Sequence, residues 1–169
     1  MDGQSVVQQL HYAFTGSAFI FMEDCDFTWT IGATDQRDLD QKHVAKLADM
    51  FAVQGVHWMP GHCHVSVTIN KSTLSQYLNQ HSDIVLRIDP PPVSAVTDYY
   101  SQLSSFSQST GSKFEVQAAM HRLHAAALLA KKQSEENPGT PVVPVRFVAD
   151  IYDPGNLFPV IIFYAANCL

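Results

Sequence analysis

His121 and Arg122 are the residues with the clearest chemical potential, because they open a segment rich in alanine and leucine. That composition predicts a helix from about Ala119 to Lys132. The first backbone N–H groups of a helix lack intrahelical partners and carry partial positive charge. Arg122 can add two parallel hydrogen bonds to phosphate oxygens, and His121 can donate one more or shuttle a proton near neutral pH. This arrangement predicts an anion-binding site; the alternative is a structural salt bridge of Arg122 and local capping or packing of His121.

The segments around this pair predict the elements that position it. In Lys113–Gln117, Phe114 and Val116 alternate with polar neighbours, which indicates a strand leading into the helix. Val142–Ala149 and Phe158–Ala165 are apolar enough for two later strands, joined by a turn that contains proline and glycine.

The first third of the chain predicts two strands and a helix. Ser17–Met22 and Phe27–Ile31 read as strands around an acidic turn. An apolar stripe then runs from Val44 to Phe51 with helical spacing. Asp38 or Asp40 can cap its N-terminus, and a glycine at position 55 suits its C-terminal end.

The middle of the chain predicts shorter elements. Cys63–Ile69 alternates as a strand does, and Ser72 is expected to cap a short helix after it. Ile84–Ile88 reads as another short strand. Helical spacing continues from Val93 to about Phe106, while Ser104–Ser112 has the composition of a loop.

Length and composition predict one domain spanning residues 1–169, and the order of expected strands and helices predicts an α/β (α+β) fold, a small mixed sheet with packed helices. The 169 residues are 46% hydrophobic and 15% charged, with a net charge of −6, and this acidic balance disfavours DNA binding by the domain alone. No stretch is long and apolar enough for a bilayer, so no membrane association is expected. An odd count of three cysteines and the absence of a signal peptide favour an intracellular protein of cytoplasm or nucleus. The apolar C-terminus leaves open a fragment of a longer protein.

Two motifs together resemble the ParB/sulfiredoxin superfamily. The first is Asp35-Gln36-Arg37 with Leu39-Asp40 before the helix that ends at Gly55. The second runs from Phe114 through His121-Arg122 to Ala126 and is followed by Pro141-Val142-Val143-Pro144-Val145. The resemblance covers roughly residues 28 to 149. It implies that Arg37 is the second arginine of a shared phosphate pocket.

Three positions depart from the pattern of that superfamily. Ala119 stands where the His-Arg box usually has glycine, and its Cβ limits the close approach of a ligand. Met120 replaces the cysteine of the sulfiredoxin relatives, and a thioether cannot do the chemistry of a thiolate. Ala118 stands in an acidic position, which leaves Glu115 as the nearby carboxylate for a general base or metal ligand. The favoured interpretation of Glu115 is a solvated strand residue, so any enzyme activity stays open.

The resemblance therefore implies a nucleotide- or phosphate-binding domain with weak or lost phosphoryl-transfer or hydrolase activity. Its pocket would consist of Arg37, the backbone of Ala118, Ala119 and Met120, and the side chains of His121 and Arg122. The expected ligand is a small phosphorylated molecule, with CTP or ATP and magnesium as the candidate cofactors. His121 and Glu115 are the catalytic candidates.

Two other functions remain open from the sequence. A non-catalytic interaction or assembly module, including a homo-oligomer, would pair through the apolar run Val160–Ala166. A DNA-associated nuclease or partition-type clamp is the second. His57, His62, Cys63 and His64 form the metal-like cluster, but at most two of them converge on one strand face, so no metal site is expected.

Overall fold

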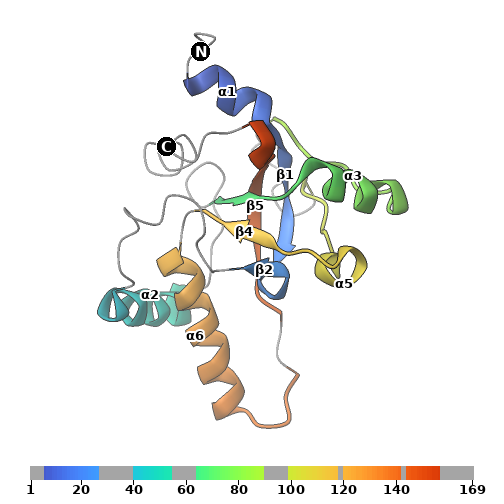
Figure 1. The fold of residues 1–169 in the computed structure, drawn as a ribbon. Coiled ribbons are helices and arrows are strands. Elements are labelled where there is room, and N and C mark those ends of the chain that lie inside the picture. Colours follow the sequence, from blue (N-terminus) through green and yellow to red (C-terminus); the bar gives the residue numbers. More distant parts are fainter. Residues whose placement is uncertain are drawn as a thin grey trace.

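The computed structural model describes residues 6–26, 40–54, 64–89, 99–117, 120–141 and 144–156. Its centre is a mixed five-stranded sheet in the order β1-β5-β3-β4-β2 (Figure 1). The strands β1 and β5 are antiparallel, as are β3 and β4, whereas the pairs β5–β3 and β4–β2 are parallel. The predicted α+β fold class is confirmed. The strands are β1 Phe14–Phe21, β2 Cys25–Asp26, β3 Val65–Thr68, β4 Phe114–Val116 and β5 Arg146–Tyr152.

The helices form two groups beside the sheet. In Figure 1, α3 and α5 lie to the right of it and α2 and α6 to the lower left, while α1 leads into β1 at the top. Val44 and Ala48 of α2 pack against Ala125 of α6 in an apolar interface. The helices are α1 Val6–Ala13, α2 Gln41–Gln54, α3 Lys71–Gln80, α5 Phe106–Thr110 and α6 Met120–Glu136, with 3-10 turns η1 Met22–Asp24 and η3 Pro154–Asn156. Within the part of the chain that the structure describes, no helix combines the length and apolarity needed to cross a bilayer.

One face of the sheet carries the main hydrophobic core. Alternate side chains of a strand point to opposite faces, and the apolar set of each central strand falls on the same side. The core side chains that are completely buried include Ile20, Val65, Val67, Leu103, Phe106, Phe114, Leu123, Phe147 and Ile151. The opposite face receives the polar residues of the same strands together with a smaller apolar cluster of Phe19, Val148 and Tyr100.

Four predicted elements are confirmed with shifted ends. The first strand begins at Phe14, and the strand expected at Lys113–Gln117 is β4, with Phe114 and Val116 buried as predicted. The helix expected from Val44 to Phe51 is α2, and Asp40 caps it by accepting hydrogen bonds from the N–H groups of the first turn. The helix expected from Ala119 begins at Met120 and continues to Glu136.

The cap predicted for α3 was wrong by two residues. The carboxamide oxygen of Asn70 accepts the N–H of Ser72 at 3.1 Å, so Asn70 is the N-cap and Ser72 lies within the first turn. An asparagine at this position satisfies one of the backbone donors that a helix start leaves unpaired.

The region from Ile84 to Ser112 differs most from the prediction. In place of a strand at Ile84–Ile88, Arg87 forms a single antiparallel bridge with Ser17. Of the helix expected from Val93 to about Phe106, residues 93–98 lie outside the described part of the chain. Its end from Ser101 to Leu103 is extended backbone, because Phe19 exchanges hydrogen bonds with Ser101 and Leu103. The edge of β1 thus pairs with two short segments in turn.

The expected loop at Ser104–Ser112 contains the helix α5. Its first residue, Phe106, is completely buried and contacts the rings of Tyr77 and Phe114. The polar composition of this segment predicted a loop. Burial of Phe106 stabilises a helix there instead, and composition alone does not reveal that burial.

Several predictions fall on residues that the structure leaves undescribed, among them the strands Phe27–Ile31 and Phe158–Ala165, the apolar run Val160–Ala166 and the helix end at Gly55. The strand expected at Val142–Ala149 is β5, which starts later, at Arg146, and ends at Tyr152. Pro144 precedes it and lacks the N–H that a strand position would donate.

Candidate functional site

The start of α6 places the predicted His-Arg pair in the first turn of a 17-residue helix. Met120 is the first helical residue, so His121 and Arg122 are the second and third. Both side chains are half-buried, and Arg122 already has an interaction within the protein. Ala118, Ala119 and Arg37 lie outside the described residues.

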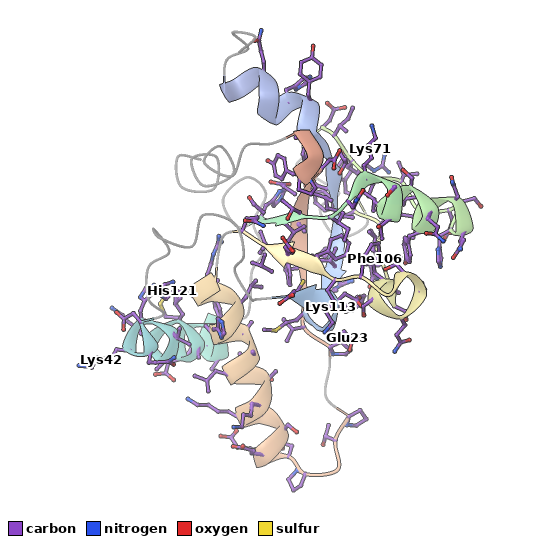
Figure 2. The ribbon with its side chains drawn as sticks, viewed as in Figure 1. Glu23, Lys42, Lys71, Phe106, Lys113 and His121 are labelled. Carbon is purple, nitrogen blue, oxygen red and sulfur yellow. The ribbon has the colours of Figure 1, made fainter. Side chains whose placement is uncertain are left out.

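The start of α2 meets the start of α6 through a direct hydrogen bond. The backbone N–H of Asp40, the cap of α2, donates to Nε2 of His121 at 3.1 Å. The rings of His43 and His121 also meet edge to face, with centroids 5.4 Å apart. Figure 2 shows His121 at the sheet end of α6 and beside α2. Two helix N-termini, each with partial positive charge, therefore converge.

This contact defines what His121 does in the structure. A ring nitrogen that accepts a hydrogen bond carries no proton, so Nε2 of His121 is unprotonated here. The contact agrees with the local packing role that the sequence left open for this residue. A second role toward a ligand would have to use Nδ1 or a rearranged Asp40 segment.

The carboxylate that caps α2 adds a negative charge where the N-termini of α2 and α6 meet. The carboxylate of Asp40 accepts the N–H groups of Lys42 and His43 at 3.0 and 3.2 Å. Its negative charge offsets part of the positive end of α2. Neither α2 nor α6 has an acidic residue in its first turn.

The polar face of the sheet contains a row of residues that runs across three strands to the residue that follows β4. Ser17 on β1 pairs with Asp150 on β5, and Asp150 pairs with Ser66 on β3. The N–H of Gln117, directly after β4, donates to the carbonyl of Ser66 at 2.8 Å. This row ends three residues before the first residue of α6.

A second row on the same face includes the predicted catalytic carboxylate. Glu115 on β4 is half-buried and pairs with Thr68 on one side and with Asp26 of β2 on the other. Like charges directly opposite each other are unfavourable in a sheet, so these two carboxylates form a local acidic pair. The sequence analysis missed Asp26, because a strand of two residues has no readable alternation.

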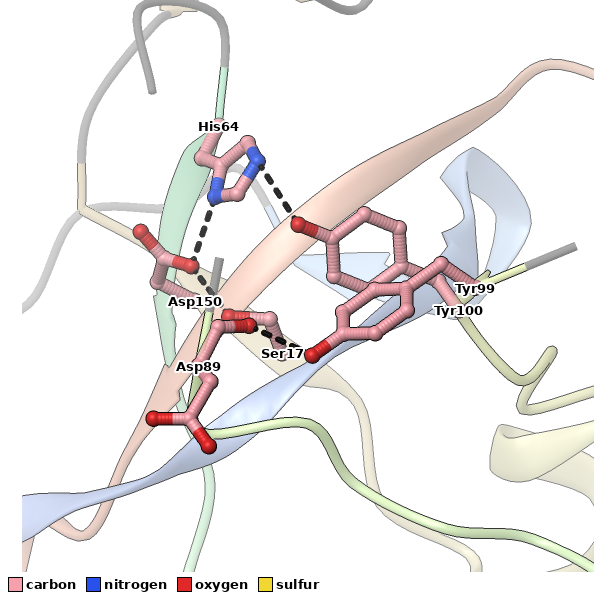
Figure 3. A network of polar contacts seen from close by, with 6 residues as sticks. All are labelled: Ser17, His64, Asp89, Tyr99, Tyr100 and Asp150. Atoms are coloured by element: carbon pink, nitrogen blue, oxygen red, sulfur yellow. Dashed lines mark hydrogen bonds and ion pairs between the residues drawn. The ribbon is translucent and has the colours of Figure 1, made fainter. Parts of the chain in front are cut away.

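His64, Asp150, Ser17 and Tyr100 form a hydrogen-bonded network on the polar face (Figure 3). One carboxylate oxygen of Asp150 accepts the hydroxyl of Ser17 at 2.5 Å and lies 2.8 Å from Nδ1 of His64. The hydroxyl of Tyr100 is 3.5 Å from Nε2 of His64. Nearby, the hydroxyl of Tyr99 donates to the carbonyl of Asp89 at 2.8 Å.

The order of these contacts excludes a serine nucleophile activated by histidine. In such a triad the histidine lies between serine and aspartate, whereas here Asp150 lies between Ser17 and His64. Burial, and then the charge of Asp150, raises the pKa of Tyr100, so its phenol stays neutral. The network consists of an aspartate–histidine pair with a hydroxyl on either side.

The polar face also has a buried acceptor without a partner. Gln117 donates from Nε2 to the hydroxyl of Thr68 at 3.0 Å, and both residues are buried. Among the described residues, the other amide atom of Gln117, Oε1, has no hydrogen-bond partner. Such an orphaned acceptor costs free energy.

Residues 13–136 match the N-terminal domain of DUF3723, a family of proteins of unknown function. The chain belongs to this family. No curated protein and no solved structure matches the chain.

In this DUF3723 domain, the matched span contains both helix starts and all of the network except Asp150. Of the predicted metal-like cluster, only His64 lies among the described residues, and it bonds to Asp150. No group of three or more possible metal ligands occurs within those residues. Burial raises the pKa of the Cys25 thiol, which keeps it protonated.

Proposed function

We propose that this DUF3723 domain binds a small phosphorylated ligand at the α2–α6 junction and that its fold is ParB/sulfiredoxin-like. A nucleotide, CTP or ATP with magnesium, is the form of ligand that the resemblance implies. The pocket would use Arg37, the backbone of Ala118, Ala119 and Met120, and the side chains of His121 and Arg122.

The observation that supports this proposal most is the hydrogen bond between Asp40 and His121. The two motifs that carry the family resemblance are about eighty residues apart in the sequence, and this contact brings them together. A phosphate pocket built from both motifs requires this proximity. The free N–H groups expected at the start of α6 and a nearby guanidinium suit a phosphate group.

The charge balance favours a small ligand over a nucleic acid. The chain has 10 Lys and Arg against 16 Asp and Glu. Binding along a DNA backbone uses many cationic contacts at once, whereas one or two arginines at a helix start suffice for a single phosphate. A nucleotide-bound Mg²⁺ commonly takes one or two protein carboxylates, and Glu115 with Asp26 is a pair of that kind.

Isothermal titration of the 169-residue chain with CTP, ATP and ADP in the presence of magnesium tests this proposal. We expect uptake of at least one nucleotide and loss of binding in Arg122→Ala. Charge-assisted hydrogen bonds to phosphate contribute about 1.5 to 3 kcal/mol each, so losing two weakens binding by about 100-fold or more.

The matched control is Arg146→Ala, which removes the same charge at a different place. The guanidinium of Arg146 lies over the ring of Phe19, 4.5 Å from its centroid, on β5. We expect this variant to bind as the unmodified chain does. If the unmodified chain takes up none of the three nucleotides, the proposal is wrong.

A further inference from the structure

The C-terminal part of α6 carries two adjacent lysines followed closely by a serine. Lys131 and Lys132 stand three and two positions before Ser134, and no other serine or threonine in the sequence has basic residues at both of these positions. Protein kinases choose their substrates partly by such patterns of charge, because acidic groups beside the active site attract the basic side chains. The pattern therefore indicates a target of a kinase with an acidic substrate groove.

This part of α6 lies in solvent. Every residue from Lys131 to Pro141 is exposed, whereas residues 127–130, one turn earlier in the helix, are half-buried. In Figure 1 the C-terminal end of α6 points away from the sheet. A second protein can therefore reach Ser134 without disturbing the hydrophobic core.

The two lysines are held only weakly within the protein. Nζ of Lys131 lies 4.0 Å from a carboxylate oxygen of Glu135, and Nζ of Lys132 lies 3.9 Å from one of Asp49. The four side chains are 47% to 78% exposed. Exposed ion pairs of this kind contribute little to stability, so both ammonium groups can exchange these partners for the carboxylates of a kinase.

The last turn of α6 can open without loss of core packing. The backbone N–H and the side-chain amide of Asn137 both donate to the carbonyl of Gln133, at 3.1 and 3.2 Å. Local opening is easiest where the hydrogen bonds are exposed to solvent and few apolar contacts hold the chain. Both conditions are met here, since the whole turn is exposed. An opened turn presents Ser134 as an extended segment that fits a substrate groove.

We infer that Ser134 is phosphorylated by a protein kinase that selects basic residues two and three positions before its serine, and that the phosphate opens the last turn of α6. The hydroxyl oxygen of Ser134 forms a bond to the γ-phosphorus of ATP, while its proton passes to the catalytic base of the kinase. The bond between that phosphorus and the bridging oxygen breaks, and its electron pair leaves with ADP. This modification site is independent of the ligand proposed for the α2–α6 junction.

A phosphate at Ser134 is electrostatically unfavourable for the helix. It adds a charge of about −1.5 to −2 near neutral pH. The carbonyl end of a helix carries partial negative charge, and the last turn of α6 already contains Glu135 and Glu136 and has no basic residue. Lys131, one turn earlier, offsets only part of the added charge. The last turn should therefore open more often after phosphorylation.

Incubation of the chain with ATP, magnesium and the catalytic subunit of cyclic-AMP-dependent protein kinase, which has this charge selectivity, tests the site. By intact mass spectrometry we expect a single phosphate on the unmodified chain and none on Ser134→Ala. Losing one charge-assisted hydrogen bond weakens recognition by about tenfold or more, so Lys131→Ala and Lys132→Ala should each lower kcat/KM of phosphorylation by about that factor. The matched control is Ser109→Ala, because Ser109 is an exposed serine in α5 with no basic residue at these two positions. This variant should take up phosphate as the unmodified chain does.

Amide hydrogen exchange of the phosphorylated chain measures the effect on the helix. The amides of residues 133–137 should exchange about three- to tenfold faster than in the unmodified chain, and those of α3 should exchange at the same rate. Absence of phosphate uptake, or equal uptake in Ser134→Ala, overturns the assignment of the site. Uptake at Ser134 with unchanged exchange in residues 133–137 overturns the effect assigned to the phosphate.

Discussion

Replacing Asp24 by alanine should destabilise the protein substantially, because this carboxylate holds α5 in place. Asp24 is 1% exposed. Its Oδ1 accepts the backbone N–H of Ser107 at 2.9 Å and the hydroxyl of Ser107 at 2.6 Å. Without it, two donors near the start of α5 lose their acceptor.

The expected loss follows from opposing contributions. Each hydrogen bond to a charged group contributes about 1.5 to 3 kcal/mol. Part of this is offset because Asp24→Ala also removes a buried carboxylate whose Oδ2 has no partner within the part of the chain that the structure describes. We therefore expect the free energy of unfolding to fall by about 2 to 4 kcal/mol. Asp24→Asn keeps an acceptor at Oδ1 and should cost about 1 kcal/mol.

Urea unfolding followed by far-ultraviolet circular dichroism measures these differences. Glu23→Ala is the control, since Glu23 directly precedes Asp24 and has an exposed carboxylate. This variant should change the free energy of unfolding by less than about 0.5 kcal/mol. Ser107→Ala removes only the hydroxyl donor and should cost about 1 kcal/mol. An Asp24→Ala variant as stable as Glu23→Ala would refute the role assigned to this carboxylate.

Two further predictions concern β1 and β5. Gly16→Ala should cost about 2 to 4 kcal/mol, because Gly16 has a φ of +138° and a Cβ would lie 2.7 Å from that of Leu86. Gly111 also has a positive φ, of +71°, but a Cβ added there would meet no described atom within 4 Å. Gly111→Ala should therefore cost about 1 kcal/mol in the same urea assay. Equal losses of stability in the two variants would contradict the predicted clash at Gly16. Burial, and then Asp150, raises the pKa of Tyr152 from 10.0 to about 12, so between these pH values the folded state keeps a proton that the unfolded state loses. The neutral phenol of Tyr152 therefore contributes about 2 to 3 kcal/mol to the free energy of unfolding below pH 10, and this contribution should be lost as pH rises through 12. Tyr152→Phe should reduce this decline in urea titrations across that range, and an unchanged decline would refute the assignment.

The elements that could be predicted are those whose pattern is local. The helix α2 shows its apolar stripe and its cap Asp40 within fifteen residues, and β4 shows alternation around Phe114 and Val116. The helix α5 could not be predicted, because its position depends on burial of Phe106 and on Asp24, which is 83 residues away from Ser107. Long-range contacts of this kind leave no trace in a short window of sequence.

The residues of the candidate site could likewise be predicted only in part from the sequence. His121 and Arg122 could be singled out because they open a recognisable helix. The network of Ser17, His64 and Asp150 could not, because its hydrogen bonds join residues separated by 133 and 86 positions. A serine, a histidine and an aspartate occur by chance in most sequences, and only the strand register brings these three together. Arg37 remains a prediction.

Stability alone does not account for this network, and that supports a functional interpretation. Taking a carboxylate and an imidazole partly out of water is unfavourable, and replacing such buried polar pairs by apolar residues of similar size is often neutral or stabilising. The neighbouring positions already provide apolar packing, since Phe19, Val148 and Tyr100 form a cluster on the same face. An apolar set at Ser17 and Asp150 could extend that cluster. The polar network is thus more than the packing of this face requires.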